Sequence, residues 1–387
     1  MFLFVIKIIF TPLILVNYLI PKNKKLWIFG ASNGRKYNDN PRALFEYVNE
    51  YKKDIRAIWI TRNRAEEQKV RNKGYEVYRA GTLAGIYYSI RAGVILTSHS
   101  FKDVSLAAFL FPRKTKLVNL WHGTFLKRIF GCDDLVFTGW TTFLTLLLRG
   151  YLGRTQDMVV AACALSKETF LKHFFIKYYS IPDEFVKITG QPRNDRLFSA
   201  KNSSGVKKII YVPTWRDYDV NFDLFGQFGF DVAKLDAALQ DADAELFIKL
   251  HMGQAGGRNI KDEVSRSKRI KFLEVDDIYD VLGEMDALIN DYSNVFFDFL
   301  LLNRPMIFAP FDLGAYREKR GFFYDYDAVT PGPKARNWDE VAELIKRIFV
   351  KDEYAEKRKE VNDMFNYWQD DRSCARVYDE IIRLIEI

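Results

Sequence analysis

The stretch DALINDYSNVFFDFLLLNRPMIFAP, residues 286–310, contains the pattern that decides the fold. An apolar run ends at Asn290, a polar turn follows, and an apolar helical stretch from Asn294 leads into a second apolar run at residues 304–310. Strand, helix and strand in this order predict a βαβ unit with parallel strands. Ligands of open parallel sheets bind at the carboxyl ends of the strands, so the turn after Asn290 is a candidate binding loop.

The same alternation continues in both directions along the chain. Helical patterns, such as those of residues 41–51 and 65–74, separate short apolar runs. These runs occupy residues 26–31, 55–60, 93–98, 116–121, 207–213, 244–250 and 269–275. The polar stretch KNSSG at residues 201–205 is the best linker between the two series. We therefore expect an α/β protein with two successive Rossmann-like domains that face a cleft.

The two ends of the chain add a terminal segment each to these two expected domains. The expected parts are a membrane-associated segment at 1–21, α/β domains at 22–203 and 204–365, and a C-terminal helix at 366–387 able to pack back on the first domain. Residues 1–20 carry only one charge, Lys7, and lysines follow at 22, 24 and 25. Such a segment either spans the bilayer or lies on its cytoplasmic face, and a buried first helix is the alternative. Residues 138–152 are also apolar, which is typical of a core helix or a membrane-facing helix.

Composition excludes several classes of protein. The chain has 387 residues, of which 48% are hydrophobic and 28% charged, so it is neither disordered nor collagen-like. Its three cysteines form no disulfide framework, and a reducing compartment fits best. Residues 1–205 hold 32 Lys and Arg against 15 Asp and Glu, a net charge of +17, whereas residues 206–387 have a net charge of −9. The first half is therefore expected to meet nucleic acid, a membrane face or a polyanionic substrate.

Polar residues gather where four apolar runs stop. The candidates are the stretches that begin at His122, Thr214, His251 and Asp291. A histidine can take a proton from an attacking hydroxyl, an arginine can bind phosphate oxygens through its fork, and a helix that starts near Asn294 offers free backbone N–H groups. Together these groups suit transfer of a phosphate-containing group. His99 closes another apolar run.

Each of these residues also has a structural interpretation. Histidines at strand ends are often structural, Ser and Asn before a helix often serve only as caps, and Arg216 beside Trp215 can form a stacked surface pair. The motifs of several other site classes are absent: the chain has no GxGxxG, GxxxxGK[ST] or HExxH motif and no nucleic-acid-binding signature. We predict no metal, no cofactor and no nucleic-acid partner.

The motifs nevertheless occur in a recognisable order. They are NLWHGTFLKRI at 119–129, ITGQPRNDRLF at 188–198, YVPTWRD at 211–217, IKLH at 248–251 and INDYSNVFFDFLLLNRPMIF at 289–308, and the stretches at 37–47 and 311–327 fit as well. This set closely resembles the CDP-glycerol glycerophosphotransferase family of teichoic acid synthesis, from about Lys25 to the C-terminus. The resemblance implies a glycosyltransferase-B-like fold in a peripheral membrane enzyme at the cytoplasmic face of the cell membrane.

The resemblance also implies an activity. CDP-glycerol would bind mainly to the second domain, a hydroxyl of a lipid-linked or polymeric acceptor would attack the phosphate attached to glycerol, and CMP would leave. His122 and His251 match the two essential histidines, with His122 as the expected base, although the two roles could be exchanged. The residues expected near the donor phosphates are Thr214, Arg216, Asp291, Ser293 and Asn294. The residues expected on the acceptor side or in support are Gly123, Thr124, Lys127 and Arg193.

Two departures from the family pattern leave the donor open. Phe125 replaces the usual proline, and Asn294 replaces the second serine of a DYSS motif. The first hypothesis is glycerophosphate transfer in teichoic-acid-like or capsule-like polymer synthesis by a short, primase-like member. A related transferase that uses CDP-ribitol or a nucleotide sugar is the second. A catalytically inactive, membrane-bound binding protein is the third, and it is disfavoured because both histidines are present.

Overall fold

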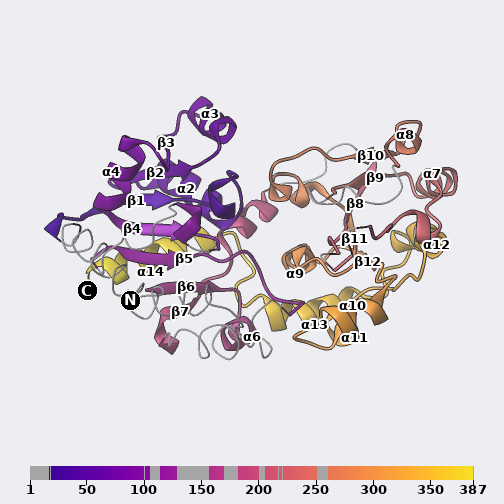
Figure 1. Cartoon of the computed structure of the whole chain (residues 1–387). Helices are drawn as coiled ribbons and strands as arrows, with labels where there is room; N and C mark the ends of the chain where they lie inside the picture. The colour runs from indigo at the N-terminus through magenta and orange to yellow at the C-terminus, as the bar shows by residue number, and fades with distance from the viewer. Residues whose placement is uncertain are drawn as a thin grey trace, which may run out of the picture. The chain divides into compact units, whose positions relative to one another are not determined.

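The computed structural model describes residues 17, 19–99, 101–104, 114–128, 157–169, 182–199, 205–216, 218–219, 221–250 and 260–386 of the chain. These residues form two compact units, each built on a parallel sheet (Figure 1). The first unit draws its described residues from Met1–His122, Phe130–Asp195 and Asp370–Ile387, and the second from Gly123–Ile129 and Arg196–Gln369.

The first unit contains a seven-stranded sheet of order β3-β2-β1-β4-β5-β6-β7. Its strands are β1 (Asn23–Phe29), β2 (Arg56–Thr61), β3 (Val77–Arg79), β4 (Ala92–Thr97), β5 (Lys116–Asn119), β6 (Met158–Ala161) and β7 (Val186–Ile188). Every residue of β4 is buried, as expected for a central strand covered on both faces. Alternate residues of β1 enter opposite cores, with Trp27 and Phe29 on one face and Leu26 and Ile28 on the other.

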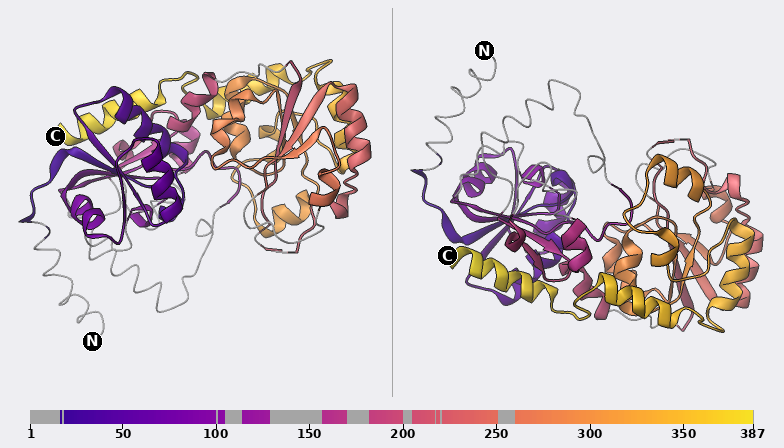
Figure 2. Two further views of the ribbon diagram at one scale, coloured as in Figure 1. Left: turned by 90° about the horizontal axis from the view of Figure 1, so that it is seen from above. Right: turned by 90° about the horizontal axis from the view of Figure 1, so that it is seen from below.

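Helices cover both faces of this sheet (Figure 2). They are α2 (Asp39–Tyr51), α3 (Arg64–Asn72), α4 (Leu83–Arg91), α6 (Ala164–Thr169) and α14 (Ser373–Glu386). The last of these, α14, comes from the far end of the chain and buries Val377 and Ile381 in the core with Trp27. The carboxylate of Asp195 accepts hydrogen bonds from the backbone N–H groups of Ser373 and Cys374, both at 2.8 Å. Asp195 therefore holds the first turn of α14 on the first unit.

The second unit contains a five-stranded sheet of order β10-β9-β8-β11-β12. Its strands are β8 (Lys207–Val212), β9 (Ala244–Ile248), β10 (Ile270–Phe272), β11 (Ala287–Asn290) and β12 (Met306–Phe308). Its helices are α7 (Val232–Asp241), α8 (Lys261–Val264), α9 (Val295–Phe299), α10 (Leu313–Lys319), α11 (Tyr326–Val329), α12 (Trp338–Ile348) and α13 (Ala355–Phe365). In its own sequence order this sheet reads 3-2-1-4-5, the same order as the first five strands of the other sheet.

The predicted α/β class with parallel sheets is confirmed. Each apolar run chosen from the sequence forms a strand, and the stretch after Asn294 forms α9, continued by a 3₁₀ turn at Leu300–Leu302. The strands β3, β6 and β7 were not predicted from the sequence, although the equally short strands β5, β10, β11 and β12 were. Period alone does not separate a strand of three or four residues from a loop.

The division of the chain differs from the prediction at two places. The chain passes from the first unit to the second after Asp195, inside the 3₁₀ helix Pro192–Phe198, rather than at residue 203. A short segment, Gly123–Ile129, also belongs to the second unit, although the strand before it and β6 belong to the first.

Among the described residues, no helix combines the length and apolar character needed to cross a membrane. Residues 1–16 and 138–152 lie outside the described part.

Candidate functional site

In the loop after β5, the two residues that flank His122 have an unusual backbone conformation. Trp121 has a φ of 55° and Gly123 a φ of 122°, both in the left-handed half of the map. A tryptophan there carries steric strain, which persists only where the surrounding structure fixes it. The strained turn carries His122 past the carboxyl end of β5, where ligands of parallel sheets bind.

Two buried side chains fix this loop by hydrogen bonding to its carbonyl groups. The amide nitrogen of Asn40 donates to the carbonyl oxygens of Leu120 and Trp121, both at 3.0 Å. Arg193 donates to the carbonyl oxygen of His122 at 3.0 Å and to the carboxylate of Asp39 at 2.7 Å. Arg193 therefore lies behind the histidine and supports its backbone.

The ring of His122 lies in a stack of aromatic groups. It is parallel to the ring of His99, with 4.3 Å between centroids and 4° between planes, and its other neighbour is Trp121 at 4.5 Å. Its Nδ1 lies 3.4 Å from the carbonyl oxygen of Ser98. A carbonyl oxygen can only accept, so this contact favours a proton on Nδ1 and leaves Nε2 as an acceptor.

Electrostatics keep this histidine neutral. Burial is the largest cause, and with His99 and Arg193 it lowers the pKa of His122 from 6.5 to about 3, against the opposing influence of Asp39 and the Ser98 carbonyl. A neutral imidazole with a free Nε2 is the form that a general base requires.

His99 is the main residue that the sequence-based choice of site residues missed. Its position at the end of β4 was the only available signal, and nothing in the spacing relates it to His122. The loop that carries it is fixed by the buried carboxylate of Asp103, which accepts from the backbone N–H groups of Ser98 and His99, both at 2.8 Å. The His99 Nδ1 is 2.8 Å from the Ser98 hydroxyl, which lies 3.3 Å from the same carboxylate.

In the second unit, Asp291 and Arg216 form a buried charge cluster at the ends of β8 and β11. Asp291 is fully buried and accepts from the Thr214 backbone N–H at 3.0 Å and from Arg216 at 2.6 Å. The Nε and Nη2 of Arg216 donate to the two carboxylate oxygens of Asp312 at 2.9 and 2.7 Å. The pKa of Asp312 is lowered overall, because hydrogen bonds and charge from Arg216 outweigh the burial that would raise it.

This cluster revises the predicted phosphate contact of Arg216. The guanidinium fork is occupied by two carboxylates, and only 2% of the residue is exposed. Arg216 and Asp291 therefore fix the loops at the strand ends rather than presenting free charge to a ligand. The Thr214 backbone is part of the same arrangement, while its buried hydroxyl has no hydrogen-bond partner in the described part of the chain.

The predicted capping role of Ser293 and Asn294 is also revised. Asn294 stands at the N-cap of α9 with helical backbone angles, and its side chain makes no capping hydrogen bond. Its Oδ1 instead accepts from the backbone N–H of Leu126 at 3.3 Å. The carbonyl oxygen of Ser293 accepts from Asn290 at 3.1 Å. With five residues, α9 is too short to develop a full helix dipole at its N-terminus.

The residues that follow His122 pair with residues 321–323 of the second unit through an isolated antiparallel bridge. Lys127 pairs in antiparallel fashion with Phe322, the Arg128 N–H donates to Gly321 at 3.1 Å, and the Phe323 N–H donates to Leu126 at 2.9 Å. Thr124 is buried, and among the described residues its hydroxyl has no hydrogen-bond partner. The predicted supporting residues Gly123, Thr124 and Lys127 thus belong to the second unit.

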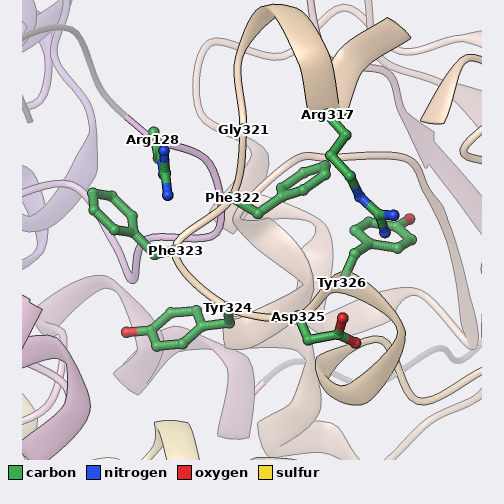
Figure 3. A pocket seen from close by; sticks show the side chains of 8 residues that line it. All are labelled: Arg128, Arg317, Gly321, Phe322, Phe323, Tyr324, Asp325 and Tyr326. Atoms are coloured by element: carbon green, nitrogen blue, oxygen red, sulfur yellow. The ribbon is translucent and has the colours of Figure 1, made fainter. Parts of the chain in front are cut away.

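Beside this paired segment, the second unit has a pocket of about 440 Å³ (Figure 3). Its lining residues are Arg128, Arg317, Gly321, Phe322, Phe323, Tyr324, Asp325 and Tyr326. The Tyr326 hydroxyl donates to the carbonyl oxygen of Asp291 at 2.8 Å, so the pocket is linked to the buried charge cluster. The predicted second histidine, His251, lies outside the described residues, and its catalytic role stays a prediction.

Comparison with known proteins gives one consistent result. Residues 13–383 match the sequence model of the family described as CDP-glycerol:poly(glycerophosphate) glycerophosphotransferase. The teichoic acid poly(glycerol phosphate) polymerase of Bacillus spizizenii is 30% identical, over 94% of this chain and 93% of that protein. The teichoic acid glycerol-phosphate transferase of Staphylococcus aureus is 29% identical, over 93% of this chain and 94% of that protein.

Solved structures support the fold. A structure of the wall teichoic acid polymerase TagF gives a TM-score of 0.75 at 24% identity, over 94% of this chain and 90% of that chain. A putative UDP-N-acetylglucosamine 2-epimerase from Listeria monocytogenes gives a TM-score of 0.56 at 14% identity, over 94% of this chain and 97% of that chain. Both likenesses concern the fold alone.

Replacing Arg216 tests the buried charge cluster. Arg216→Met leaves the carboxylates of Asp291 and Asp312 buried without their partner, and we expect the free energy of unfolding to fall by about 3–5 kcal/mol. Denaturant unfolding measures the change. The matched variant Arg216→Met with Asp312→Asn removes one of the stranded charges and should recover part of the loss. An Arg216→Met protein as stable as the parent would contradict the assignment.

The lowered pKa of His122 predicts a distinct pH behaviour. The folded imidazole should stay neutral between about pH 8 and pH 5, whereas the unfolded chain protonates this group near 6.5. The unfolded state then binds more protons, so this group reduces stability as pH falls from 6.5 towards 3. Nitrogen NMR of labelled histidine can follow each ring, because the chain has only four histidines. A His122 midpoint near 6.5 would refute the expected shift.

Proposed function

This chain belongs to the CDP-glycerol:poly(glycerophosphate) glycerophosphotransferase family, and we propose that it transfers glycerol phosphate from CDP-glycerol to a hydroxyl of a lipid-linked or polymeric acceptor in teichoic acid synthesis. Family membership over residues 13–383 supplies the reaction class. The observation that carries the assignment in the structure is the neutral, oriented His122 at the carboxyl end of β5.

The reaction needs one proton acceptor. The acceptor hydroxyl oxygen attacks the phosphorus attached to glycerol, while Nε2 of His122 takes the hydroxyl proton. The pyrophosphate P–O bond breaks, its electron pair leaves with CMP, and a phosphodiester forms. His122 can act in this way because the Ser98 carbonyl holds the proton on Nδ1 and Asn40 and Arg193 hold the loop.

The substrate itself would strengthen this base. A pKa of about 3 makes free His122 a weak proton acceptor. The phosphates of the donor bring negative charge, and a nearby negative charge raises the pKa of an imidazole. The base would thus gain strength only when a phosphate substrate is bound, which limits unproductive protonation of the empty site.

We assign donor binding to the second unit, where the loops after β8 and β11 meet. The Arg216 cluster fixes the backbone of Thr214 and Asp291 there, and the buried Thr214 hydroxyl is a candidate group for a ligand. The glycosyltransferase-B-like arrangement, with two domains facing a cleft, stays a prediction, as do the catalytic role of His251 and a donor other than CDP-glycerol.

We also propose that residues 1–21 associate the protein with the cytoplasmic face of the cell membrane. The segment is apolar with one lysine among its first twenty residues, and three further lysines follow by residue 25. The net charge of +17 in residues 1–205 favours an anionic lipid surface. A phosphate-bearing acceptor anchored in lipid would meet the enzyme at this surface.

An assay of CMP release tests the proposed reaction. We expect release with CDP-glycerol and a lipid-linked or glycerol phosphate acceptor, and less with CDP-ribitol or a nucleotide sugar. His122→Ala should lower turnover by a factor of about 10²–10⁴, the usual range for loss of a general base. His122→Gln is the matched control for size, and it should be equally slow because an amide cannot take the proton.

Two outcomes would overturn this proposal. Near-normal turnover in both His122 variants would remove His122 from the proton transfer. Absence of CMP release from the parent protein with every donor and acceptor would favour the binding-protein alternative. Thermal unfolding of each variant shows whether the fold is intact.

Deletion of residues 1–21 tests the membrane proposal. The truncated protein should sediment less with vesicles that contain anionic lipid, because the apolar surface of residues 1–20 is lost while the lysines at 22, 24 and 25 remain. Its CMP release with a soluble acceptor analogue should persist. Unchanged vesicle binding would refute the proposal, and an unfolded truncation product would show that the segment is a core helix.

A further inference from the structure

The pocket beside the paired segment of the second unit is lined by more positive than negative side chains. Two arginines, Arg128 and Arg317, line this pocket with a single carboxylate, Asp325. Arg317 belongs to residues 206–387, whose net charge is −9, and Arg128 comes from the basic first half of the chain. The Asp325 carboxylate accepts from the Ala328 N–H at 2.9 Å at the start of α11. The two guanidinium groups therefore set the charge of the pocket.

These arginines differ from Arg216 in their surroundings. Arg216 is buried and both sides of its fork contact carboxylates. Arg128 and Arg317 are exposed, and Arg317 has no ion-pair partner within the described part of the chain. In the view of Figure 3 the two side chains lie on opposite sides of Phe322. A ligand in the pocket can meet a guanidinium fork without displacing a buried carboxylate.

Packed aromatic side chains form much of the pocket wall. Phe322 lies 5.7 Å from Tyr316 and 5.3 Å from Tyr326 between ring centroids, and Tyr316 stacks on Tyr292 at 3.8 Å. The Tyr292 hydroxyl donates to Asp312 of the buried charge cluster at 2.9 Å. A volume of about 440 Å³ is within the usual range for small-molecule sites. Such walls suit the carbon skeleton of a polyol or a nucleoside beside an anionic group.

We infer that this pocket binds the phosphate ester of a substrate, with Arg128 and Arg317 contacting the phosphate oxygens. Guanidinium groups bind phosphate through two parallel N–H···O contacts, which give direction as well as charge. The inference rests on the proposed function for its two sources of phosphate ester, the donor CDP-glycerol and a glycerol phosphate unit of the acceptor. Both offer the same chemistry to the pocket.

Binding and kinetic measurements together show whether the phosphate ester in the pocket comes from the donor or from the acceptor. The variants are Arg317→Gln, Arg128→Gln and the double variant, and the control is Lys319→Gln, which removes an exposed cation from the same helix, α10, outside the pocket lining. Calorimetry measures the binding of CDP-glycerol and of glycerol 3-phosphate. The CMP-release assay gives KM for donor and acceptor separately.

In the double variant, the affinity for one of the two ligands should fall by about tenfold or more, which is the usual effect of losing a charge-assisted hydrogen bond. A higher KM for CDP-glycerol assigns the pocket to the donor, and a higher KM for the acceptor assigns it to the acceptor. Arg317→Lys should recover only part of the affinity, since lysine keeps the charge but lacks the fork. The Lys319→Gln control should match the parent protein.

Unchanged binding and unchanged KM for both ligands in a folded double variant would overturn the inference. An equal loss in Lys319→Gln would also overturn it, because general surface charge would then explain the effect. Failure of the proposed function looks different: the parent protein would release no CMP. In that case the calorimetric comparison of parent and double variant still decides whether the pocket binds phosphate esters.

Discussion

The hydrogen bonds from Asn40 and Arg193 to the carbonyl groups of residues 120–122 are the constraint on which the candidate site depends. They hold a tryptophan in the left-handed region and direct the next residue, His122, past the end of the sheet. Both donors are buried and anchored in other elements, Asn40 in α2 and Arg193 in the 3₁₀ helix at Pro192–Phe198. The loop at 120–122, α2 and the 3₁₀ helix are far apart in the sequence, and all three must be in place before His122 acquires its orientation.

The fold could be predicted from local pattern because buried parallel strands are apolar and bounded by turn residues. The runs that became β1, β4, β8 and β11 are of this kind. The site could be predicted only in part, because side-chain partners lie far apart in sequence. Arg216 meets Asp312 at a separation of 96 residues, and no spacing rule indicates that its fork is already occupied.

The contact between His99 and His122 could not be predicted from the sequence either. The position of His99 at a strand end was visible in the sequence, but its parallel stack on His122 depends on how the loops after β4 and β5 lie together. The segment after His122 was taken for part of the first domain because it follows β5 directly. Its backbone pairs instead with Phe322 and Gly321, about 200 residues later.

The attachment of α14 to the first unit affects the order in which the two units can fold during synthesis. The first unit takes its last core helix from residues 373–386, and Asp195 binds the start of that helix through backbone N–H groups. During synthesis the chain emerges from its N-terminus, so the apolar face formed by α2 and β1 stays uncovered until residues 373–386 have left the ribosome. The second unit, whose last described helix ends at Phe365, can fold before the first is complete. Nascent chains stalled before residue 373 should therefore be a form that chaperones recognise.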